Sequence, residues 1–389
     1  MNLYDSADIG GLDLAQLAAA TDHPRVLFVN NDVLGWRTFG DELSRATRAR
    51  DDMYAVHLHF HDDRSMLRKL AERRVWRGQE LRYAHGAVVR ARATRLAKTL
   101  EAPHMADLFD AIHVSPHLLA LGIVRSQWQG PLSVIFDADV RKAKEQRQTL
   151  TGPQFERQFR SLHTNEGEVV RRANRLWAMS QWAADHMAGE YHLDPDTITV
   201  IPPVRSVTAR TWDTPAHPGP VRIAFVGNDL DRKGGYRLIQ WHRDHWTRTA
   251  ELHIFTATPR PKRDLEGVVW HQRVDNRVLV SEHLKSMDFF VLPTTSDMSP
   301  FAVTEAVAAG LPVVSSAIGG IGELVQHNVS GILCDPTDDT AYITAIDTLV
   351  TDPRLRETMG RAALRNAHTT LDPHTVMTTF INGILDLAR

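Results

Sequence analysis

The fold is decided by residues 289–320, FFVLPTTSDMSPFAVTEAVAAGLPVVSSAIGG. The apolar run Phe289–Pro293 predicts a buried parallel strand, which a polar loop follows. Pro300 opens a helix, because the first amides of a helix have no internal partner and proline costs nothing there. Gly310 ends that helix, and a second apolar strand follows at Pro312–Ser316. The stretch is therefore a strand–helix–strand unit of a parallel sheet.

The same alternation continues on both sides of this unit. The breaker-rich segment 202–220 separates two alternating series and is typical of a linker. We therefore expect an α/β protein of two Rossmann-like domains, with a boundary between residues 205 and 206. Further strands are expected at 25–30, 54–60, 111–114, 132–136, 221–227, 251–256, 268–272 and 331–334, and helical stretches at 63–100 and 154–174.

Composition limits the possible class of protein. The chain has 389 residues, 43% of them hydrophobic, which suits two or three globular domains. Lys plus Arg number 45 and Asp plus Glu 47, so the net charge of −2 argues against a nucleic-acid-binding protein. A single cysteine, Cys334, excludes an internal disulfide framework, and no apolar run is long enough to span a membrane. We expect a soluble, cytoplasmic protein.

The loop and helix at 294–308 form a candidate anion site. Free amides at the start of a helix, together with its dipole, attract negative groups. Asp297 lies in the loop, and Glu305 lies about two turns into the helix. Carboxylates at such positions accept hydrogen bonds from vicinal hydroxyls of a sugar or a ribose. The alternative is a solvent-facing Asp and a Glu on the helix surface.

A second candidate motif follows the first strand of the second half. Gly227 permits a sharp turn off that strand, and Arg232 and Lys233 place two cations where the loop enters a helix. The spacing differs from a Walker A loop, and no Ser or Thr follows the lysine. The alternative is a basic, solvated turn.

Together these motifs resemble the retaining, nucleotide-sugar-dependent GT-B glycosyltransferases, the group that includes glycogen synthases and phosphatidylinositol mannosyltransferases. Four patterns occur in the family's order: strand-Gly-…-Lys-Gly, carboxylate-x7-Glu, Ala-x-Ala-x-Gly-x-Pro-Val-Val and Gly-Gly-x-x-Glu. Segments 178–182 and 198–203 resemble the family's last N-domain elements. The resemblance covers residues 170–335 well and 25–140 loosely.

The resemblance implies a fold and an activity. Two Rossmann-like domains would face an interdomain cleft. The acceptor domain would comprise residues 1–205 together with a C-terminal crossover helix at 372–389, and the donor domain residues 206–371. The protein would transfer a hexosyl group from a nucleoside diphosphate sugar, with UDP favoured, and retain its anomeric configuration. The acceptor would be a hydroxyl of a glycan, a lipid-linked glycan or a small molecule. No metal or other cofactor is required in this architecture.

The resemblance also assigns site residues. Lys233 matches the lysine that grips the donor diphosphate, Glu305 matches the ribose-binding glutamate, and Val274 stands where main-chain groups meet the nucleobase. Gly35 matches the N-domain glycine loop. The catalytic group implied is Asp137, Lys233 and Asp297. The diphosphate group is Gly227, Asn228, Arg232, Lys233, Val303 and Thr304, and the donor-sugar group is Asp297, Ser299, Pro300, Phe301 and Ala302.

Three residues depart from the family pattern. Asn228 replaces an arginine, Asp137 replaces a histidine, and Asp297 replaces a glutamate, which withdraws its carboxylate by about 1.5 Å. Cations on the diphosphate would carry the rate, because the leaving group itself takes the acceptor proton in front-face attack. Asp137 would stabilise positive charge at the anomeric carbon or act as a nucleophile. The departures leave open a non-catalytic sugar-nucleotide-binding scaffold, as well as an epimerase or a phosphorylase.

Three further patterns have ordinary alternatives. The pair Asp137 and Asp139 spells a metal-binding Asp-x-Asp, which this architecture does not need. The alternating His57, His59 and His61 face one side of a strand and either hold zinc or pack under helices. Residues 64–98 contain eleven Lys or Arg and two Glu, which indicates either solvated helices or peripheral contact with an anionic membrane.

Overall fold

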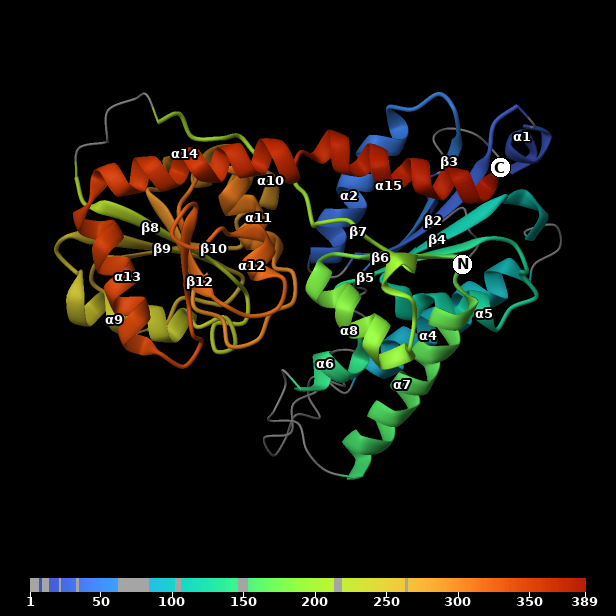
Figure 1. Ribbon diagram of the computed structural model, residues 1–389, viewed down its shortest axis with the longest axis horizontal. Helices are drawn as coiled ribbons and strands as arrows, with labels where there is room; N and C mark the ends of the chain where they lie inside the picture. The colour runs from blue at the N-terminus through green and yellow to red at the C-terminus, as the bar shows by residue number, and fades with distance from the viewer. Residues whose placement is uncertain are drawn as a thin grey trace. The chain divides into compact units, whose positions relative to one another are not determined.

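A computed structural model describes residues 7–8, 14–20, 22–32, 35–61, 84–101, 106–145, 153–212, 219–262 and 265–389. The chain forms two compact units (Figure 1). Unit 1 comprises Met1–Ile201 together with Met377–Arg389, and unit 2 comprises Pro202–Val376. The division between the units thus falls at 201/202, where the sequence predicted 205/206.

Unit 1 contains a seven-stranded sheet in the order β1-β3-β2-β4-β5-β6-β7. All neighbouring strands are parallel except β1, which pairs antiparallel with β3 at the edge. The central strands are apolar and buried, as strands covered on both faces must be. The strands are β1 (Ala7–Asp8), β2 (Arg25–Asp32), β3 (Tyr54–His61), β4 (Ala111–Ser115), β5 (Leu132–Phe136), β6 (Arg175–Ala178) and β7 (Ile198–Val200).

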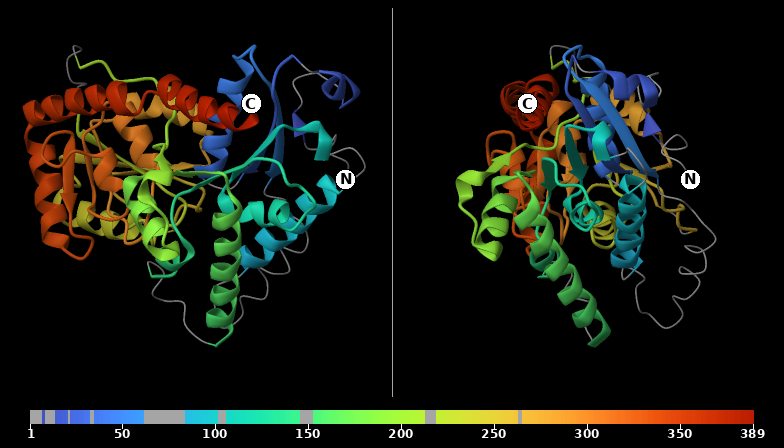
Figure 2. Two further views of the ribbon diagram at one scale, coloured as in Figure 1. Left: turned by 45° about the vertical axis from the view of Figure 1, so that its right-hand side comes forward. Right: turned by 90° about the vertical axis from the view of Figure 1, so that its right-hand side faces the viewer.

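Helices cover both faces of the unit 1 sheet. Figures 1 and 2 show α2 and α15 on one face and α4, α5 and α7 on the other. An apolar cluster lies on the second face, where Leu96 of α4 and Val169 of α7 are fully buried. The helices are α1 (Leu14–Ala19), α2 (Gly35–Arg48), α4 (Ala84–Leu100), α5 (Leu121–Val124), α6 (Val140–Glu145), α7 (Pro153–Arg172), α8 (Gln181–Tyr191) and α15 (Pro373–Ala388).

Helix α15 belongs to unit 1 from Met377 onward, although it lies at the end of the chain. Phe380 is fully buried, and its ring packs edge-on against Trp177, Phe39 and His113. Gly383 lets the helix approach closely, because a Cβ atom there would lie 2.5 Å from the Trp177 ring. The small residue and the aromatic cluster together fix the helix on this sheet.

Unit 2 contains a parallel sheet in the order β10-β9-β8-β11-β12-β13. In chain order this is 3-2-1-4-5-6, so the topological switch point lies between β8 and β11, where such sheets bind ligands at the carboxyl ends of the strands. The strands are β8 (Val221–Val226), β9 (Ala250–Thr256), β10 (Val268–Gln272), β11 (Phe289–Leu292), β12 (Val313–Ser316) and β13 (Gly331–Cys334).

The helices of unit 2 also lie on both sheet faces. Trp241 of α9 stacks on Tyr342 of α13 at 5.3 Å between ring centroids, and α11 packs against α12 and α14. The helices are α9 (Gly235–His245), α10 (Asn276–Val278), α11 (Phe301–Ala308), α12 (Ile321–Leu324), α13 (Asp339–Thr351) and α14 (Pro353–Thr370). A π-helical turn, η6 (Leu279–His283), continues α10.

Candidate functional site

The loop after β8 is shaped by its lysine and glycines. The side chain of Lys233 passes over Gly227, where an added Cβ would lie 2.6 Å from the lysine Cδ. Gly234 has φ +74°, and a Cβ there would lie 2.1 Å from the Pro293 carbonyl oxygen at the end of β11. Only glycine combines that backbone conformation with that close approach. The loop therefore brings Lys233 across the switch point.

The loops after β8 and β11 are joined by hydrogen bonds. The Arg232 carbonyl accepts from the Thr295 amide at 2.8 Å and from the Thr294 hydroxyl at 3.2 Å. The Arg232 guanidinium donates to the Ser296 carbonyl and to Asp229. The two motifs that the sequence showed separately thus form one structure at the carboxyl edge of the sheet.

Asp297 contacts both cations of this site. Its Oδ2 lies 3.2 Å from Lys233 Nζ and 3.4 Å from Arg232 Nη1, and all three side chains are at most 24% exposed. Neither contact has the alignment of a hydrogen bond, so Oδ2 is buried in ion pairs alone. Gly319, with φ +55°, allows the next turn to press against the backbone of this loop, because a Cβ there would lie 2.4 Å from the Asp297 carbonyl oxygen.

Helix α11 begins at this loop and contributes the remaining predicted groups. Pro300 is its N-cap and supplies no side-chain hydrogen bond, so the Phe301 and Ala302 amides have no side-chain cap. The Val303 and Thr304 amides donate to the Pro300 carbonyl. Ser299 Oγ and Thr304 Oγ1 are buried and have no hydrogen-bond partner among the described residues, which is the arrangement expected of groups that a polar ligand completes. The other predicted residues of this segment, Phe301, Ala302 and Val303, are buried.

Glu305 is buried in α11 and is oriented by a residue that the sequence reasoning missed. Asn276 Nδ2 donates to Glu305 Oε1 at 3.1 Å from the segment after β10. Val274, two residues earlier, is half-buried in the same segment. The sequence signal was the Asp275–Asn276 pair three residues after β10, where Asp275 caps the short helix α10.

Asn228 has a different local role from a phosphate ligand. Its Oδ1 accepts from the Ala257 amide at 2.7 Å, and its carbonyl accepts from the Thr258 hydroxyl. Asn228 therefore ties the end of β8 to the end of β9. Its Nδ2 group is the part of the side chain that could donate to an anion.

In unit 1 the two predicted residues lie at the carboxyl edge of the sheet. Gly35 begins α2 after β2, and Asp137 follows β5 directly. Asp139 is a cap, because its Oδ1 accepts from the Lys142 amide at 2.8 Å, and burial raises the pKa of this carboxyl. The turn between β5 and α6 thus uses the second acidic residue of the Asp-x-Asp pair structurally.

A buried network holds this turn, and the sequence reasoning did not find it. Both oxygens of Glu166 accept from the Val140 amide, at 3.1 and 2.9 Å. The same carboxylate contacts His117 Nε2 and accepts from the Tyr191 hydroxyl, each at 2.7 Å. Burial and the Glu166 charge raise the pKa of Tyr191. The polar groups come from four separate segments, so no local pattern shows them.

The histidines of β3 have structural partners. His57 Nδ1 lies 3.1 Å from both Asn30 and Ser44, and its Nε2 lies 2.8 Å from Thr47. His59 pairs with Asp32 at 3.0 Å, and the His61 side chain lies outside the described residues. In the parts of the chain that the structure describes, no group of three or more His, Cys, Asp or Glu side chains is arranged to hold a metal ion.

The basic region 64–98 is described only from residue 84 onward. In α4, the apolar residues Ala93, Leu96 and Leu100 face the core, and Arg92 donates to Asn31. The apolar residues that form a partial amphipathic stripe beside these charges, at 66, 67, 70, 75 and 76, lie outside the described residues. Among the described residues, no helix combines the length and apolar character that crossing a bilayer requires.

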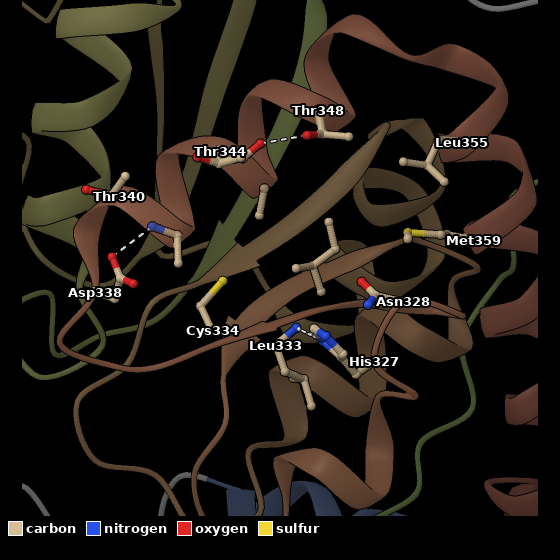
Figure 3. A pocket seen from close by; sticks show the side chains of 13 residues that line it. His327, Asn328, Leu333, Cys334, Asp338, Thr340, Thr344, Thr348, Leu355 and Met359 are labelled. Carbon is tan, nitrogen blue, oxygen red and sulfur yellow. Dashed lines mark hydrogen bonds between the residues drawn. The ribbon is translucent and has the colours of Figure 1, made fainter.

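A cavity of about 680 Å³ lies elsewhere in unit 2, beside β13, α13 and α14 (Figure 3). Its lining mixes threonines of α13 with the apolar Leu355 and Met359, and includes Cys334, whose pKa burial raises to about 11. No residue assigned to the donor site lines it. The cavity is therefore separate from the loops after β8 and β11.

Comparison with protein-family models finds a match within the second unit. Residues 220–352 match the family model described as "Glycosyl transferases group 1". The glycogen synthase of Mycobacterium tuberculosis is 27% identical over 233 residues, which cover 56% of each chain. The D-inositol 3-phosphate glycosyltransferase of Xylanimonas cellulosilytica is 27% identical over 223 residues, covering 51% of this chain and 54% of that protein. The chain thus spans about half the length of the curated relatives it matches.

Solved structures resemble the whole chain. Sucrose-phosphate synthase from Thermosynechococcus elongatus has a TM-score of 0.70 at 16% identity, covering 94% of this chain and 99% of that one. HepE from Anabaena, in complex with UDP-glucose, has a TM-score of 0.66 at 15% identity, covering 94% and 100%. At these identities the likeness shows the fold. The chain therefore has the GT-B fold, and its residues 220–352 match the group 1 glycosyltransferase family model.

Proposed function

We propose that the protein is a retaining glycosyltransferase that transfers a hexosyl group from a nucleoside diphosphate sugar to a hydroxyl group. The observation that carries this proposal is the convergence of Lys233, Arg232 and the uncapped start of α11 at the switch point of the unit 2 sheet. Two cations and a helix N-terminus form a site for a dianionic diphosphate. Sheets of this topology bind nucleotides at that position.

The remaining donor contacts follow from the geometry of unit 2. Glu305, held by Asn276, offers a fixed carboxylate to the vicinal hydroxyls of a ribose. The segment at Val274 runs beside it from the end of β10 and offers main-chain groups to a base. Ser299 and Thr304 present unpartnered hydroxyls to the sugar and the diphosphate. The donor is UDP-linked in this proposal, which the UDP-glucose complex of HepE supports.

In the proposed mechanism the cations act on the leaving group. As the glycosidic bond breaks, negative charge develops on the diphosphate, and Lys233 and Arg232 stabilise it from fixed positions. The sugar becomes oxocarbenium-like, and the acceptor hydroxyl attacks from the face that the diphosphate leaves, passing its proton to a phosphate oxygen. Asp137 would stabilise the developing positive charge or orient a sugar hydroxyl. No metal ion takes part in this scheme.

The acceptor side of the proposal rests on unit 1. A glycan, a lipid-linked glycan or a small molecule would supply the hydroxyl. Peripheral contact between the basic region 64–98 and an anionic membrane, on a cytoplasmic protein, stays a prediction. A vesicle-sedimentation assay with and without anionic lipid tests it, and equal pelleting with neutral vesicles would contradict it.

A ligand panel tests the donor assignment first. UDP, GDP, ADP and their common sugar conjugates are added to wild type and Lys233→Ala, and melting temperatures are compared. A ligand that binds only the folded state raises the melting temperature by mass action. We expect a shift with one nucleotide series, and we expect it to disappear in Lys233→Ala. Lys285→Ala removes an exposed lysine of the same unit and serves as the matched control.

Donor hydrolysis then separates catalysis from binding. An active transferase slowly transfers its sugar to water, so nucleoside diphosphate appears when the conjugate is incubated with the protein alone. A non-catalytic binding protein would show the thermal shift and release no nucleoside diphosphate. No shift with any member of the panel would refute the donor site itself.

A further inference from the structure

The ion pairs of Asp297 are unusual for a residue beside a proposed phosphate site. The cations Lys233 and Arg232 both face the same carboxylate oxygen, at 3.2 and 3.4 Å. That oxygen is buried and has no aligned hydrogen bond. Arg232 has a second carboxylate partner in Asp229, whereas Asp297 is the acidic residue that contacts both cations. A diphosphate bound to these cations would therefore lie next to a third negative group.

A bound diphosphate and the Asp297 carboxylate would repel each other, because both are negative and the site is partly buried. Such a site has a lower effective dielectric constant than water, so the repulsion is larger there than between exposed charges. The repulsion acts on any diphosphate, but a hydroxyl-bearing ligand can offset it, because a carboxylate oxygen accepts hydrogen bonds from hydroxyls. Free nucleoside diphosphate lacks the hydroxyls of the transferred sugar, although it keeps those of its ribose. It also carries one more negative charge than its sugar conjugate.

We propose that Asp297 competes with the diphosphate for Lys233 and Arg232 and thereby makes the site select intact nucleotide sugar over free nucleoside diphosphate. The proposal rests on the proposed function and adds a role in product release to it. Before transfer, the sugar hydroxyls donate to the Asp297 carboxylate, which then shares the cations with the diphosphate. After transfer these donors are gone, and the carboxylate and the diphosphate repel each other.

Calorimetric titration of charge variants tests the proposal. Asp297→Asn removes the charge with nearly the same shape, and Asp297→Glu keeps the charge on a longer side chain. The ligands are inorganic pyrophosphate, UDP, GDP, UDP-glucose and GDP-mannose. We expect Asp297→Asn to lower the Kd of pyrophosphate and of the bound nucleoside diphosphate by roughly tenfold. The Kd of the sugar conjugate should fall less or rise, because the hydroxyl acceptor is weakened.

A matched control variant, together with inorganic pyrophosphate as a ligand that has no nucleobase, distinguishes the possible outcomes. Asp244→Asn makes the same change in net charge at the far end of α9, on an exposed side chain. It should leave every Kd unchanged, as should Asp297→Glu for pyrophosphate. A melting curve for each variant shows that it is folded.

Each result decides between the proposals. If Asp297→Asn leaves the pyrophosphate Kd unchanged or raises it, competition by Asp297 is refuted. If it tightens pyrophosphate, UDP and UDP-glucose equally, competition stands but selection of the intact donor is refuted. If pyrophosphate binds as expected and neither nucleoside diphosphate binds, the proposed donor function fails while the competition stands. If pyrophosphate binds neither protein, the cations form no anion site and both proposals fail.

Discussion

Mild acid should destabilise unit 1 through two buried imidazoles. His57 and His113 are 2% and 0% exposed, and burial lowers the pKa of each to about 3. Their nitrogens contact neutral groups: His113 lies 2.9 Å from the Ser133 hydroxyl and 2.8 Å from that of Ser115. Both rings are therefore neutral in the folded protein, whereas an unfolded histidine has a pKa of about 6.5.

The direction of the effect follows from proton binding. Below pH 6.5 the unfolded state binds more protons than the folded state, so the free energy of unfolding falls as pH falls. The stability that these neutral rings contribute is fully present above pH 6.5 and is lost progressively toward pH 3. His59 and Arg48 add to the shift of His57, because their positive charges oppose its protonation.

The magnitude can be worked out for the interval from pH 7 to pH 5. One pKa unit corresponds to about 1.36 kcal/mol, and at pH 5 an unfolded imidazole is almost fully protonated while the folded one is neutral. Each histidine then contributes a loss of about 1.9 kcal/mol, and the two together about 4 kcal/mol. Since a domain is typically stable by about 5–15 kcal/mol, this loss is large.

The assay must report on unit 1 alone, because His242, His253 and His271 in unit 2 also have lowered pKa values. Urea unfolding at pH 5, 6 and 7 is followed by hydrogen–deuterium exchange of peptides from β2 and β4. The comparison is between wild type and the double variant His57→Gln, His113→Gln, which has no imidazole at these positions. Its stability can be lower at every pH, since the measured quantity is the pH slope.

We expect the pH dependence of the unfolding free energy near pH 5.5 to be smaller by about 2.5 kcal/mol per pH unit in the double variant, and by about half of that in each single variant. His192→Gln is the control, because this side chain is exposed and belongs to the same unit. A double variant that keeps the wild-type slope would falsify the assignment of the acid sensitivity to these two residues.

Three further changes test the packing that positions the site and the last helix. Gly234→Ala places a Cβ 2.1 Å from the Pro293 carbonyl at φ +74°, so the melting temperature should fall and the nucleotide-induced thermal shift should vanish; an unchanged shift would contradict the loop geometry. Gly383→Ala crowds Trp177 and should cost about 1–3 kcal/mol in urea unfolding, whereas Ala388→Gly on the same helix serves as a comparison at its end. His192→Gly relieves the left-handed residue that ends α8 and should stabilise by about 0.5–1 kcal/mol, and a loss of stability would argue against strain there.

Much of the fold follows from local sequence patterns. Apolar runs ending in glycine or polar loops predicted the strands of unit 2, and β11, α11 and β12 lie where residues 289–320 placed them. These predictions succeed because a strand covered on both faces needs a continuous apolar run and because proline and glycine act on their own backbone. The short edge strand β1 had no such pattern, since it is two residues long and pairs with a distant partner.

The sequence also indicated the groups of the candidate site but not their pairing. Gly227, Lys233, Asp297 and Glu305 stand out by their positions after strands or on a predicted helix. Strand order 3-2-1-4-5-6 makes β8 and β11 neighbours, and only this brings Asp297 within 3.2 Å of Lys233, 64 positions earlier in the chain. The Asn276 contact with Glu305 depends on the same arrangement.

The sequence by itself therefore determined the element types, the two-domain α/β class and the chemical nature of the site. Each of these depends on residues close together in the chain, whose backbone preferences and apolar period act locally. Tertiary structure alone decided which charges meet and that Glu166 holds the turn after β5. These contacts join residues far apart in the chain, and they form only because the sheets bring their loops together while the desolvated groups require partners.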